Sequence, residues 1–410
     1  MKLVVVATNL NRSELWKRWL ILKNKFNDID ITVLVPQKYE DGAKKGYTFG
    51  TKMVFEGSDY EEERFKVRPI RVKQNRFGGW SSSDIKPFIA EEKPDFVYYI
   101  GVHTSESLWQ TANATHRTKA KLLVFTMRGD LEPAKPRSLK HRLIRKYMDI
   151  LENHNVSMSD AIFVHYPDAL TAFRKNGYKG PIFINTQIGV DTSYFKFSEE
   201  GRKRIREKLG INDCYVFGGA SRLNAEKGVL DAIKALPVDE NVKYMILGSG
   251  TDDEHKAILD CAKACGVSSQ IVMPGLISWD ELPDYLSAMD CAIHIPRRTQ
   301  NWVETFSLAL VQEMSTERPV IGSRSGSVPY QIGYDTLMVD EGNIEQIHEK
   351  MLWVMKNKVD AQKIGKKMRE RCVFCFDVEH IAECFGIVLH ELVDGVYNTD
   401  HIDTAVSWSD

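Results

Sequence analysis

The stretch Glu304–Gly326, ETFSLALVQEMSTERPVIGSRSG, carries the strongest signal for the fold. It opens with an acid, continues with apolar residues at helical spacing, and passes through Arg318-Pro319 into the short apolar run Val320-Ile321-Gly322. A turn rich in serine and glycine follows. An apolar helix that leads into a short buried strand is typical of a parallel α/β sheet. We therefore expect Glu304 at the N-terminus of a helix, facing a ligand site.

The same alternation of strands and helices recurs along the chain. In the first half we expect strands at Lys2–Ala7, Asp30–Val35, Asp95–Ile100, Leu122–Thr126, Ala161–Val164 and Pro181–Asn185, and helices at Ser13–Phe26, Leu139–Leu151 and Asp168–Asn176. In the second half we expect strands at Tyr215–Gly219, Tyr244–Leu247, Ile271–Met273, Cys291–Ile295 and Pro319–Ile321, and helices at Glu199–Leu209, Gly228–Ala235, Asp253–Cys265, Asp280–Ala288 and Phe306–Ser315. The segment Gln37–Gly79, which is rich in Lys, Glu and Gly, is expected to be an irregular surface loop or hairpin.

A chain of 410 residues is too long for one ordinary core, so two domains are expected. The pattern breaks at Gln187–Phe197 and then restarts. The sequence predicts an N-terminal Rossmann-like domain over 1–193 and a C-terminal one over 197–375. A last amphipathic helix, about 378–397, is expected to pack back on the first domain. The fold class is thus α/β, with two doubly wound domains that face a central cleft.

Composition excludes several functions. Lys and Arg together number 55 against 56 Asp and Glu, so wholesale nucleic-acid binding is not indicated. The N-terminus turns polar too early for a signal peptide, and no run is long enough to span a membrane. Seven cysteines, an odd number, favour reduced thiols in a cytoplasmic protein. Cys372 and Cys375 form a CxxC pair. We expect them to be packed apolar thiols, and a metal or redox site is the alternative.

Two helical segments carry basic residues between apolar ones. The first is Leu139–Leu151 with the residues just before it, and the second contains Trp16-Lys17-Arg18-Trp19. Basic amphipathic helices suit an anionic membrane surface, which makes peripheral membrane binding one interpretation. The other interpretation is two helices packed on the sheet with solvated charged faces.

The segment Ser221–Gly228, SRLNAEKG, directly follows an expected strand that ends in two glycines, Gly218 and Gly219. Arg222 and Lys227 place two positive charges there, and the next helix points its positive end the same way. Arginine offers a bidentate fork and lysine a point charge. A diphosphate is the ligand that fits. The alternative is a surface turn with solvated charges.

Two further turns follow strands. Gly248-Ser249-Gly250 is weak evidence, since the position where a dinucleotide fingerprint needs a third glycine is Asp253. Gly275-Leu276-Ile277 offers backbone groups that suit a nucleotide base edge, whereas Ser278 and Glu281 form a capping box for the next helix. Glu304 together with these cations suits a ligand that has both hydroxyls and phosphates, such as a nucleotide sugar.

In order, RLNAEKG, LGSG, MPGLISWDELPDYLSAMDCAIHIP, ETFSLALVQEM, RPVIGSRSGSVPYQI and MVD resemble the nucleotide-sugar half of family 4 glycosyltransferases, which are retaining enzymes with the GT-B architecture. The resemblance is dense over about 215–345. It is looser in the first half, where MKLVVV, Met127–Pro133 and Ile188-Gly189-Val190-Asp191 fit.

The resemblance implies a role for each matching residue. Arg222 and Lys227 would bind the donor diphosphate, Glu304 would contact the donor sugar, and all three are the implied catalytic residues. Position 312 matches the acid that holds the ribose hydroxyls, but here it is Gln312, while Glu313 matches a small residue. The implied donor-binding set also contains Gly219, Gly248, Gly250, Gly275, Leu276, Thr305, Phe306, Ser307 and Leu308.

The first half departs from the family pattern. The glycine-rich loop after the first strand is replaced by Ala7–Asn11, and Asn9 and Arg12 become candidates for phosphate or acceptor contacts. The histidine that many members carry after the strand LLVFT is replaced by Met127-Arg128. His103 and Arg128 are the nearest candidates on the acceptor side, and a structural role for His103 stays open.

The implied activity is retaining transfer of a hexose from a UDP- or GDP-sugar to a glycan, lipid or protein-linked acceptor, as in polysaccharide biosynthesis, without metal or other cofactor. Because Gln312 replaces the acid and the glycine-rich loop is missing, a non-catalytic GT-B subunit that binds a partner is the alternative. An epimerase of the same fold is a third reading. The sequence identifies neither the sugar and base nor the oligomeric state.

Overall fold

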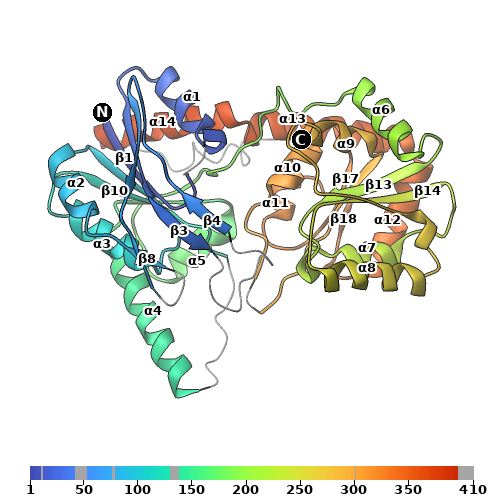
Figure 1. Cartoon of the computed structure of the whole chain (residues 1–410), viewed down its shortest axis with the longest axis horizontal. Coiled ribbons are helices and arrows are strands. Elements are labelled where there is room, and N and C mark those ends of the chain that lie inside the picture. The colour runs from blue at the N-terminus through green and yellow to red at the C-terminus, as the bar shows by residue number, and fades with distance from the viewer. Residues whose placement is uncertain (11–12, 42–52, 76–78, 130–137, 301, 396–410) are drawn as a thin grey trace. The chain divides into compact units, whose positions relative to one another are not determined.

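A computed structural model describes residues 1–10, 13–41, 53–75, 79–129, 138–300 and 302–395 of the chain (Figure 1). The chain folds into two compact units. The first contains the described residues up to Gln187 and the final helix from Glu379 on, and the second runs from Ile188 to Val378. The expected α/β class with two Rossmann-like units is confirmed.

The first unit is built on an eight-stranded sheet in the order β12-β11-β10-β9-β1-β2-β6-β5. Its strands are β1 (Lys2–Ala7), β2 (Asp30–Pro36), β5 (Tyr60–Glu62), β6 (Phe65–Ile70), β9 (Phe96–Ile100), β10 (Lys121–Phe125), β11 (Ala161–Val164) and β12 (Ile182–Ile184). Its helices are α1 (Lys17–Lys25), α2 (Ile85–Glu92), α3 (Glu106–Thr115), α4 (Leu139–Ser157), α5 (Pro167–Lys175) and α14 (Val378–Asp394), with a 3₁₀ turn at Ser13–Leu15. All pairs in the sheet are parallel except β5–β6.

Side chains of β1 alternate between two separate cores, one on each face of the sheet. Leu3 and Val5 pack in a core that includes residues of α1 and α14, and Val4 and Val6 pack in a core with residues of α2 and α3. This alternation is the two-residue period of a strand, and burial on both faces explains the unbroken valine run. Within the first unit, Phe385 of α14 stacks edge-on against Trp19 of α1 at a centroid distance of 5.9 Å.

The expectation of an irregular excursion over Gln37–Gly79 was wrong for β6. This strand pairs in parallel with β2, with Ile31 opposite Phe65 and Val35 opposite Pro69. The strand contains Pro69, which cannot donate a hydrogen bond to a neighbouring strand. The neighbouring edge strand β5 ends at the pair Tyr60–Val67, so it does not reach Pro69. Two small antiparallel pairs, β3 (Lys38–Asp41) with β4 (Met53–Glu56) and β7 (Lys73–Gln74) with β8 (Trp80–Ser81), complete this region.

The second unit has a six-stranded parallel sheet in the order β15-β14-β13-β16-β17-β18. Its strands are β13 (Tyr215–Ala220), β14 (Val242–Leu247), β15 (Ile271–Gly275), β16 (Cys291–His294), β17 (Val320–Ser323) and β18 (Met338–Val339). Its helices are α6 (Glu199–Leu209), α7 (Val229–Ala235), α8 (Asp252–Ala264), α9 (Leu282–Ala288), α10 (Leu308–Ser315), α11 (Val328–Ile332), α12 (Ile344–Lys356) and α13 (Lys358–Phe376), with 3₁₀ turns η2 (Ala225–Lys227) and η3 (Ser268–Gln270).

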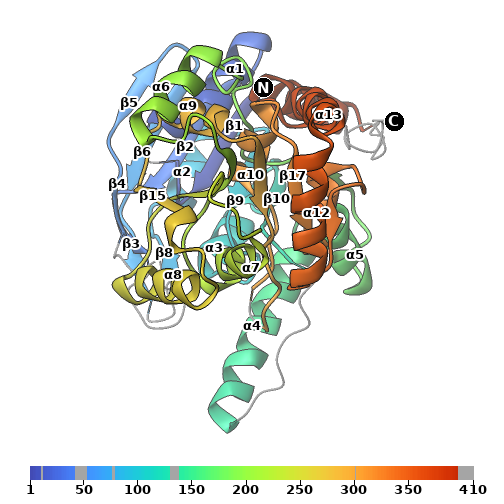
Figure 2. The ribbon, with the colours of Figure 1, turned by 90° about the vertical axis from the view of Figure 1, so that its right-hand side faces the viewer.

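Helices cover both faces of this second sheet. On one face α7 contacts both α8 and α12 (Figure 2), and α9, α10 and α13 form the other layer. The strand order reverses at β13, whose neighbours are β14 and β16. In open parallel sheets ligands bind at such a switch point, at the carboxyl ends of the strands. A ligand site is therefore expected in the segments after β13 and β16.

Candidate functional site

The segments after β13 and β16 bring Lys227 and Glu304 into contact. Lys227 ends η2, and its Nζ forms an ion pair with Oε2 of Glu304. The two side chains are 11% and 8% exposed, so water screens this pair far less than it screens a surface pair. Nζ also lies 4.9 Å from the ring centroid of Trp302, at cation–π range. The structure thus joins two of the three residues expected to be catalytic.

The two segments are held together by backbone contacts. Gly228 adopts φ +75°, and a Cβ built on it would lie 2.2 Å from the carbonyl oxygen of Ile295. The N–H of Arg297 donates to the carbonyl of Glu226 over 2.7 Å, and the Arg297 guanidinium pairs with Asp231. Only glycine fits at position 228, because any side chain would separate the segment that carries Lys227 from the one after β16.

Glu304 does not start the helix, which corrects the expectation from the sequence. α10 begins at Leu308, and its N-cap is Ser307, whose Oγ accepts from the N–H of Leu310 over 3.3 Å. Serine is among the preferred N-cap residues. Glu304 therefore lies in the loop before the helix, where Lys227 rather than the helix dipole compensates its charge.

The turn after β17 contacts the backbone of Glu304. Ser327 donates its backbone N–H to the carbonyl of Glu304 over 2.8 Å. Gly326 has φ +51°, and a Cβ on it would lie 2.0 Å from the same carbonyl. The N–H of Ser327 is thus already bonded to the loop that contains Glu304. This hydrogen bond helps to hold Glu304 in place.

The remaining donor-side candidates lie at the ends of neighbouring strands. Arg222 is half-buried in the turn after β13. Gly248 follows β14, and a Cβ on it would lie 1.9 Å from the carbonyl oxygen of Ser221, which explains that glycine by packing. A Cβ on Gly219 would meet the carbonyl oxygen of Ile293 in β16 at 2.7 Å, so close strand packing requires that glycine too.

Three more candidates stand at this edge. A Cβ on Gly250 would meet Leu223 and Glu254 side-chain atoms within 3 Å, just before the Thr251–Glu254 capping box of α8. Gly275 ends β15 with φ +88° and open space around its Cα. Leu276, the next residue, is 79% exposed, which is far more than a leucine usually is. An exposed apolar side chain beside open backbone suits the face of a flat ring.

The candidates around the start of α10 differ in exposure. Thr305, Phe306 and Leu308 are half-buried, whereas Ser307 is buried and held by Gln331, which accepts from its N–H over 2.9 Å. Gln312 is buried on α10, and its Nε2 lacks a hydrogen-bond partner among the described residues.

Two buried residues of the site, Glu313 and His294, were not predicted as site residues from the sequence. Glu313 is fully buried, and its Oε1 accepts from the N–H of Ala220 over 3.0 Å. Its Oε2 lies 3.6 Å from Nδ1 of His294, the last residue of β16. The sequence signal for Glu313 was an acid within the apolar run of α10. Because this position matches a small residue in the family pattern, Gln312 was predicted as the site residue instead.

The first-unit candidates lie at the ends of β9 and β10. Nδ1 of His103 is 3.0 Å from Oγ1 of Thr126, and its Nε2 is 3.4 Å from Nη1 of Arg128. Arg128 also pairs with Glu152. Burial lowers the pKa of His103 to about 4, so the imidazole is neutral near pH 7. Asn9 is exposed after β1, and Arg12 lies outside the described residues.

A second buried histidine in the same sheet gives a pH prediction. His165 follows β11, its Nδ1 lies 2.9 Å from Oγ1 of Thr186, and burial lowers its pKa to about 3. Because the unfolded chain binds this proton near pH 6.5, stability is full above that pH and falls as pH drops toward 3. Between pH 7 and 4.5 the free energy of unfolding of the wild type should fall, and that of His165→Gln should fall by about 2 kcal/mol less, as measured by urea unfolding. An unchanged pH dependence would contradict this assignment.

Cys372 and Cys375 lie within α13 and are both buried. The thiol of Cys372 donates to the carbonyl of Val311 over 3.2 Å, and burial raises its pKa. A buried thiol with a raised pKa is a poor metal ligand and nucleophile. Among the described residues no cluster of three or more His, Cys, Asp and Glu could hold a metal ion. These cysteines serve as packing residues of the core.

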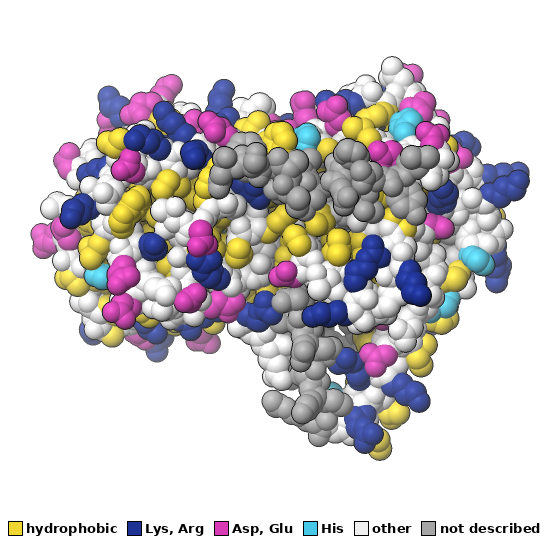
Figure 3. All heavy atoms as spheres, turned by 180° about the vertical axis from the view of Figure 1, so that it is seen from behind, with side chains coloured by type: hydrophobic (Ala, Val, Ile, Leu, Met, Phe, Trp, Pro, Cys, Tyr) yellow, Lys and Arg dark blue, Asp and Glu magenta, His cyan; other side chains and the backbone are white. Residues whose placement is uncertain are grey.

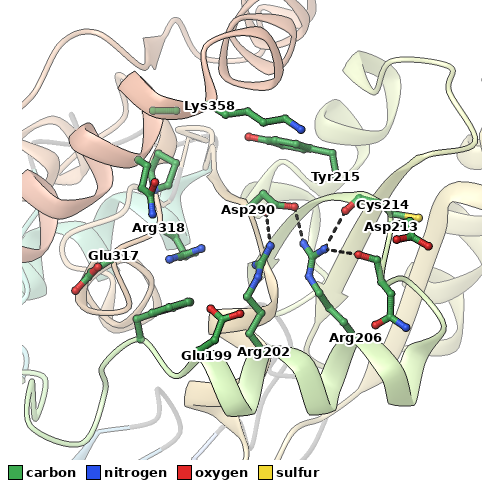
Figure 4. Close-up of a pocket in the computed structure, with 15 residues that line it drawn as sticks. Glu199, Arg202, Arg206, Asp213, Cys214, Tyr215, Asp290, Glu317, Arg318 and Lys358 are labelled. Atoms are coloured by element: carbon green, nitrogen blue, oxygen red, sulfur yellow. Dashed lines mark hydrogen bonds and ion pairs between the residues drawn. The ribbon is translucent and has the colours of Figure 1, made fainter.

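A cavity of about 450 Å³ lies at the opposite edge of the second sheet, where its strands begin (Figure 4). Arg202 and Arg206 both pair with Asp290 there. Together with Arg318 they also donate to carbonyls at the C-terminal end of α9: Ser287, Ala288 and Met289. Cations at the C-terminus of a helix stabilise it. These arginines are therefore engaged within the fold, far from the strand ends that form the site.

Comparisons with known proteins show that the segment with the site matches a family model. Residues 201–371 match the model of the family Glycosyl transferases group 1. These residues form a group 1 domain. A GDP-mannose-dependent alpha-(1-6)-phosphatidylinositol monomannoside mannosyltransferase of Mycolicibacterium smegmatis is 30% identical over 168 residues, 39% of this chain and 43% of that protein. An MMP alpha-(1->4)-mannosyltransferase of Mycolicibacterium hassiacum is 23% identical over 60% of this chain and 54% of that protein. The match thus spans about half the length of these relatives.

Solved structures extend the likeness of the fold to nearly the whole chain. The crystal structure of Anabaena HepE in complex with UDP aligns with a TM-score of 0.70 at 16% identity, covering 95% of this chain and all of that one. The chain has the GT-B fold. Arg222, Lys227, Glu304 and Glu313 all lie inside the group 1 domain, whereas Asn9, His103 and Arg128 lie outside it.

Proposed function

We propose that this protein is a glycosyltransferase that transfers a hexose from a nucleoside diphosphate sugar, UDP- or GDP-linked, to a glycan, lipid or protein-linked acceptor. The observation that carries the proposal is the buried Lys227–Glu304 pair at the switch point of the group 1 domain. It puts a cation suited to a diphosphate beside an acid suited to sugar hydroxyls. The named activities of the mannosyltransferase relatives and the UDP bound to HepE support the same chemistry.

In this mechanism negative charge builds on the departing diphosphate. Lys227 and Arg222 stabilise that charge electrostatically, at low cost because the fold already holds them in place. They supply the positive charge that a metal ion would otherwise provide, so we propose metal-independent transfer with no further cofactor. We further propose retention of configuration, with the acceptor hydroxyl attacking from the face that the diphosphate leaves.

The test is turnover of a panel of UDP- and GDP-hexoses by the purified protein in the presence of chelator. Release of nucleoside diphosphate is measured, and the anomeric configuration of the product is read by NMR. The proposal predicts release from at least one donor with an α product from an α donor. Nucleotide binding without any turnover, with or without added metal ions, would instead favour the non-catalytic binding subunit that Gln312 suggests.

A feature of α4 favours a membrane-bound acceptor. In the part of the chain that the structure describes, no helix is long and apolar enough to cross a bilayer. However, α4 extends beyond the rest of its unit (Figure 1), and its apolar residues Leu139, Leu143, Tyr147 and Ile150 are exposed on one side at helical spacing. Basic residues flank this stripe, and Figure 3 shows both kinds together on the end of α4. We propose that the stripe enters the surface of an anionic membrane.

Vesicle sedimentation tests this membrane contact. The protein is expected to bind vesicles that contain phosphatidylglycerol more tightly than pure phosphatidylcholine, and less tightly at high salt. Leu143→Ser with Ile150→Ser should weaken binding at least about 10-fold, because each removes an exposed side chain that would be buried. Leu259→Ser with Leu352→Ser, two exposed residues of the second unit, is the matched control. Equal binding by both double variants would refute the role of α4.

A further inference from the structure

A fully buried carboxylate contacts the residue just before the segment that carries Arg222 and Lys227. Glu313 on α10 has no exposed side-chain surface, and its Oε1 accepts from the backbone N–H of Ala220 over 3.0 Å. Ala220 is the last residue of β13. The segment with Arg222 and Lys227 begins at the next residue, so this hydrogen bond fixes the point from which the segment starts.

The second oxygen of the same carboxylate faces the neighbouring strand. Oε2 of Glu313 lies 3.6 Å from Nδ1 of His294, which ends β16 and is itself buried. The segment that carries Glu304 follows this strand. One side chain therefore contacts the final residues of both neighbouring strands at the switch point.

Core packing alone does not explain an acid at this position. Its helix neighbours Leu310, Val311 and Met314 are fully buried, and a buried carboxylate is costly unless it is paired and hydrogen-bonded. Among the described residues, Oε2 of Glu313 and Nε2 of His294 lack hydrogen-bond partners. An apolar residue of similar size would stabilise such a site at least as well. The hydrogen bond to Ala220 is what an apolar residue could not supply.

We propose that Glu313 is a positioning residue that sets the place of Arg222 and Lys227, and thereby tunes the affinity of the site for the diphosphate part of the donor. This inference rests on the proposed function. It assigns to Glu313 a role that does not require contact with the donor. It predicts that a change at position 313 affects recognition of the diphosphate more than recognition of the nucleoside.

Calorimetric titrations with nucleoside diphosphates and monophosphates test whether Glu313 affects recognition of the diphosphate more than recognition of the nucleoside. UDP and UMP, and GDP and GMP, are titrated into the full chain, and the ratio of the two affinities is compared between variants. Glu313→Ala is expected to lower the diphosphate-to-monophosphate ratio about 10-fold, because the N–H of Ala220 loses its buried acceptor and the segment shifts. Glu313→Gln keeps an acceptor oxygen and should hold the ratio within about twofold of wild type.

Ser287→Ala is the matched control for a loss of stability. Ser287 is fully buried in the same unit, and its Oγ donates to the carbonyl of Pro283 over 2.7 Å, away from the strand ends of the site. This variant should lower the melting temperature but leave the ratio unchanged. A reduced ratio in Ser287→Ala, an unchanged ratio in Glu313→Ala, or an equal loss in Glu313→Gln would overturn the inference. If the wild type binds neither diphosphate, the proposed function fails and this inference falls with it.

Discussion

The double variant Arg222→Ala/Lys227→Ala should lose at least about 10⁴-fold in turnover of its nucleotide sugar. Each positive side chain stabilises charge on the departing diphosphate, and removal of one such group typically lowers kcat by about 10²–10³. The losses should combine because both cations act on the same developing charge from different positions. The measurement is the initial rate of nucleoside diphosphate release at saturating donor, compared with wild type.

The control for this experiment removes two positive charges elsewhere in the same unit. Lys256→Ala with Lys263→Ala changes exposed lysines of α8 and should leave the rate unchanged. The same fall in both double variants would mean that net charge, and not the geometry of the site, controls the rate. A rate within tenfold of wild type in Arg222→Ala/Lys227→Ala would show that these two residues do not bind the donor diphosphate.

The second large effect concerns the Lys227–Glu304 ion pair, whose two side chains are almost fully buried. Glu304→Leu leaves the ammonium of Lys227 buried without its partner and should destabilise the second unit by about 3 kcal/mol. Lys227→Met combined with Glu304→Leu removes both charges and should return the stability to within about 1 kcal/mol of wild type. Both variants should be inactive, because neither retains the acid for the sugar.

Urea unfolding and donor turnover, measured on the same samples, separate the two consequences of these changes. Recovery of stability without recovery of activity is the expected pattern. If Glu304→Leu and the double variant were equally unstable, the charges would not be coupled in the folded chain. If the double variant were active, the pair would have no part in transfer.

Local patterns in the sequence predicted most strands of both sheets. Lys2–Ala7 and Ala161–Val164 were placed with correct bounds because they are apolar on both faces, as central parallel strands are. β6 was missed because the surrounding segment Gln37–Gly79 is rich in Lys, Glu and Gly, and it contains Pro69, which cannot donate to a ladder. That proline is tolerated only because β5 ends before it, a fact of sheet order that no local pattern contains.

The site shows the same division between local and tertiary information. The turn chemistry after β13 and the acid at position 304 were sufficient to single out Lys227 and Glu304. Their direct contact depends on the strand order, which makes β13 and β16 neighbours. The start of α10 was placed too early because Phe306 continues the apolar pattern, whereas Ser307 caps the helix. Glu313 was missed because adjacent helix residues point about 100° apart, and only the fold reveals that its side chain meets Ala220.

The most direct test of the central claim is a crystal structure of the protein grown with a saturating nucleoside diphosphate that binds in solution. We expect diphosphate oxygens within about 3.2 Å of Lys227 Nζ and of the Arg222 guanidinium, at the carboxyl ends of β13 and β16. A diphosphate bound elsewhere, with Lys227 still closed on Glu304 and no ligand at this edge of the sheet, would contradict the account.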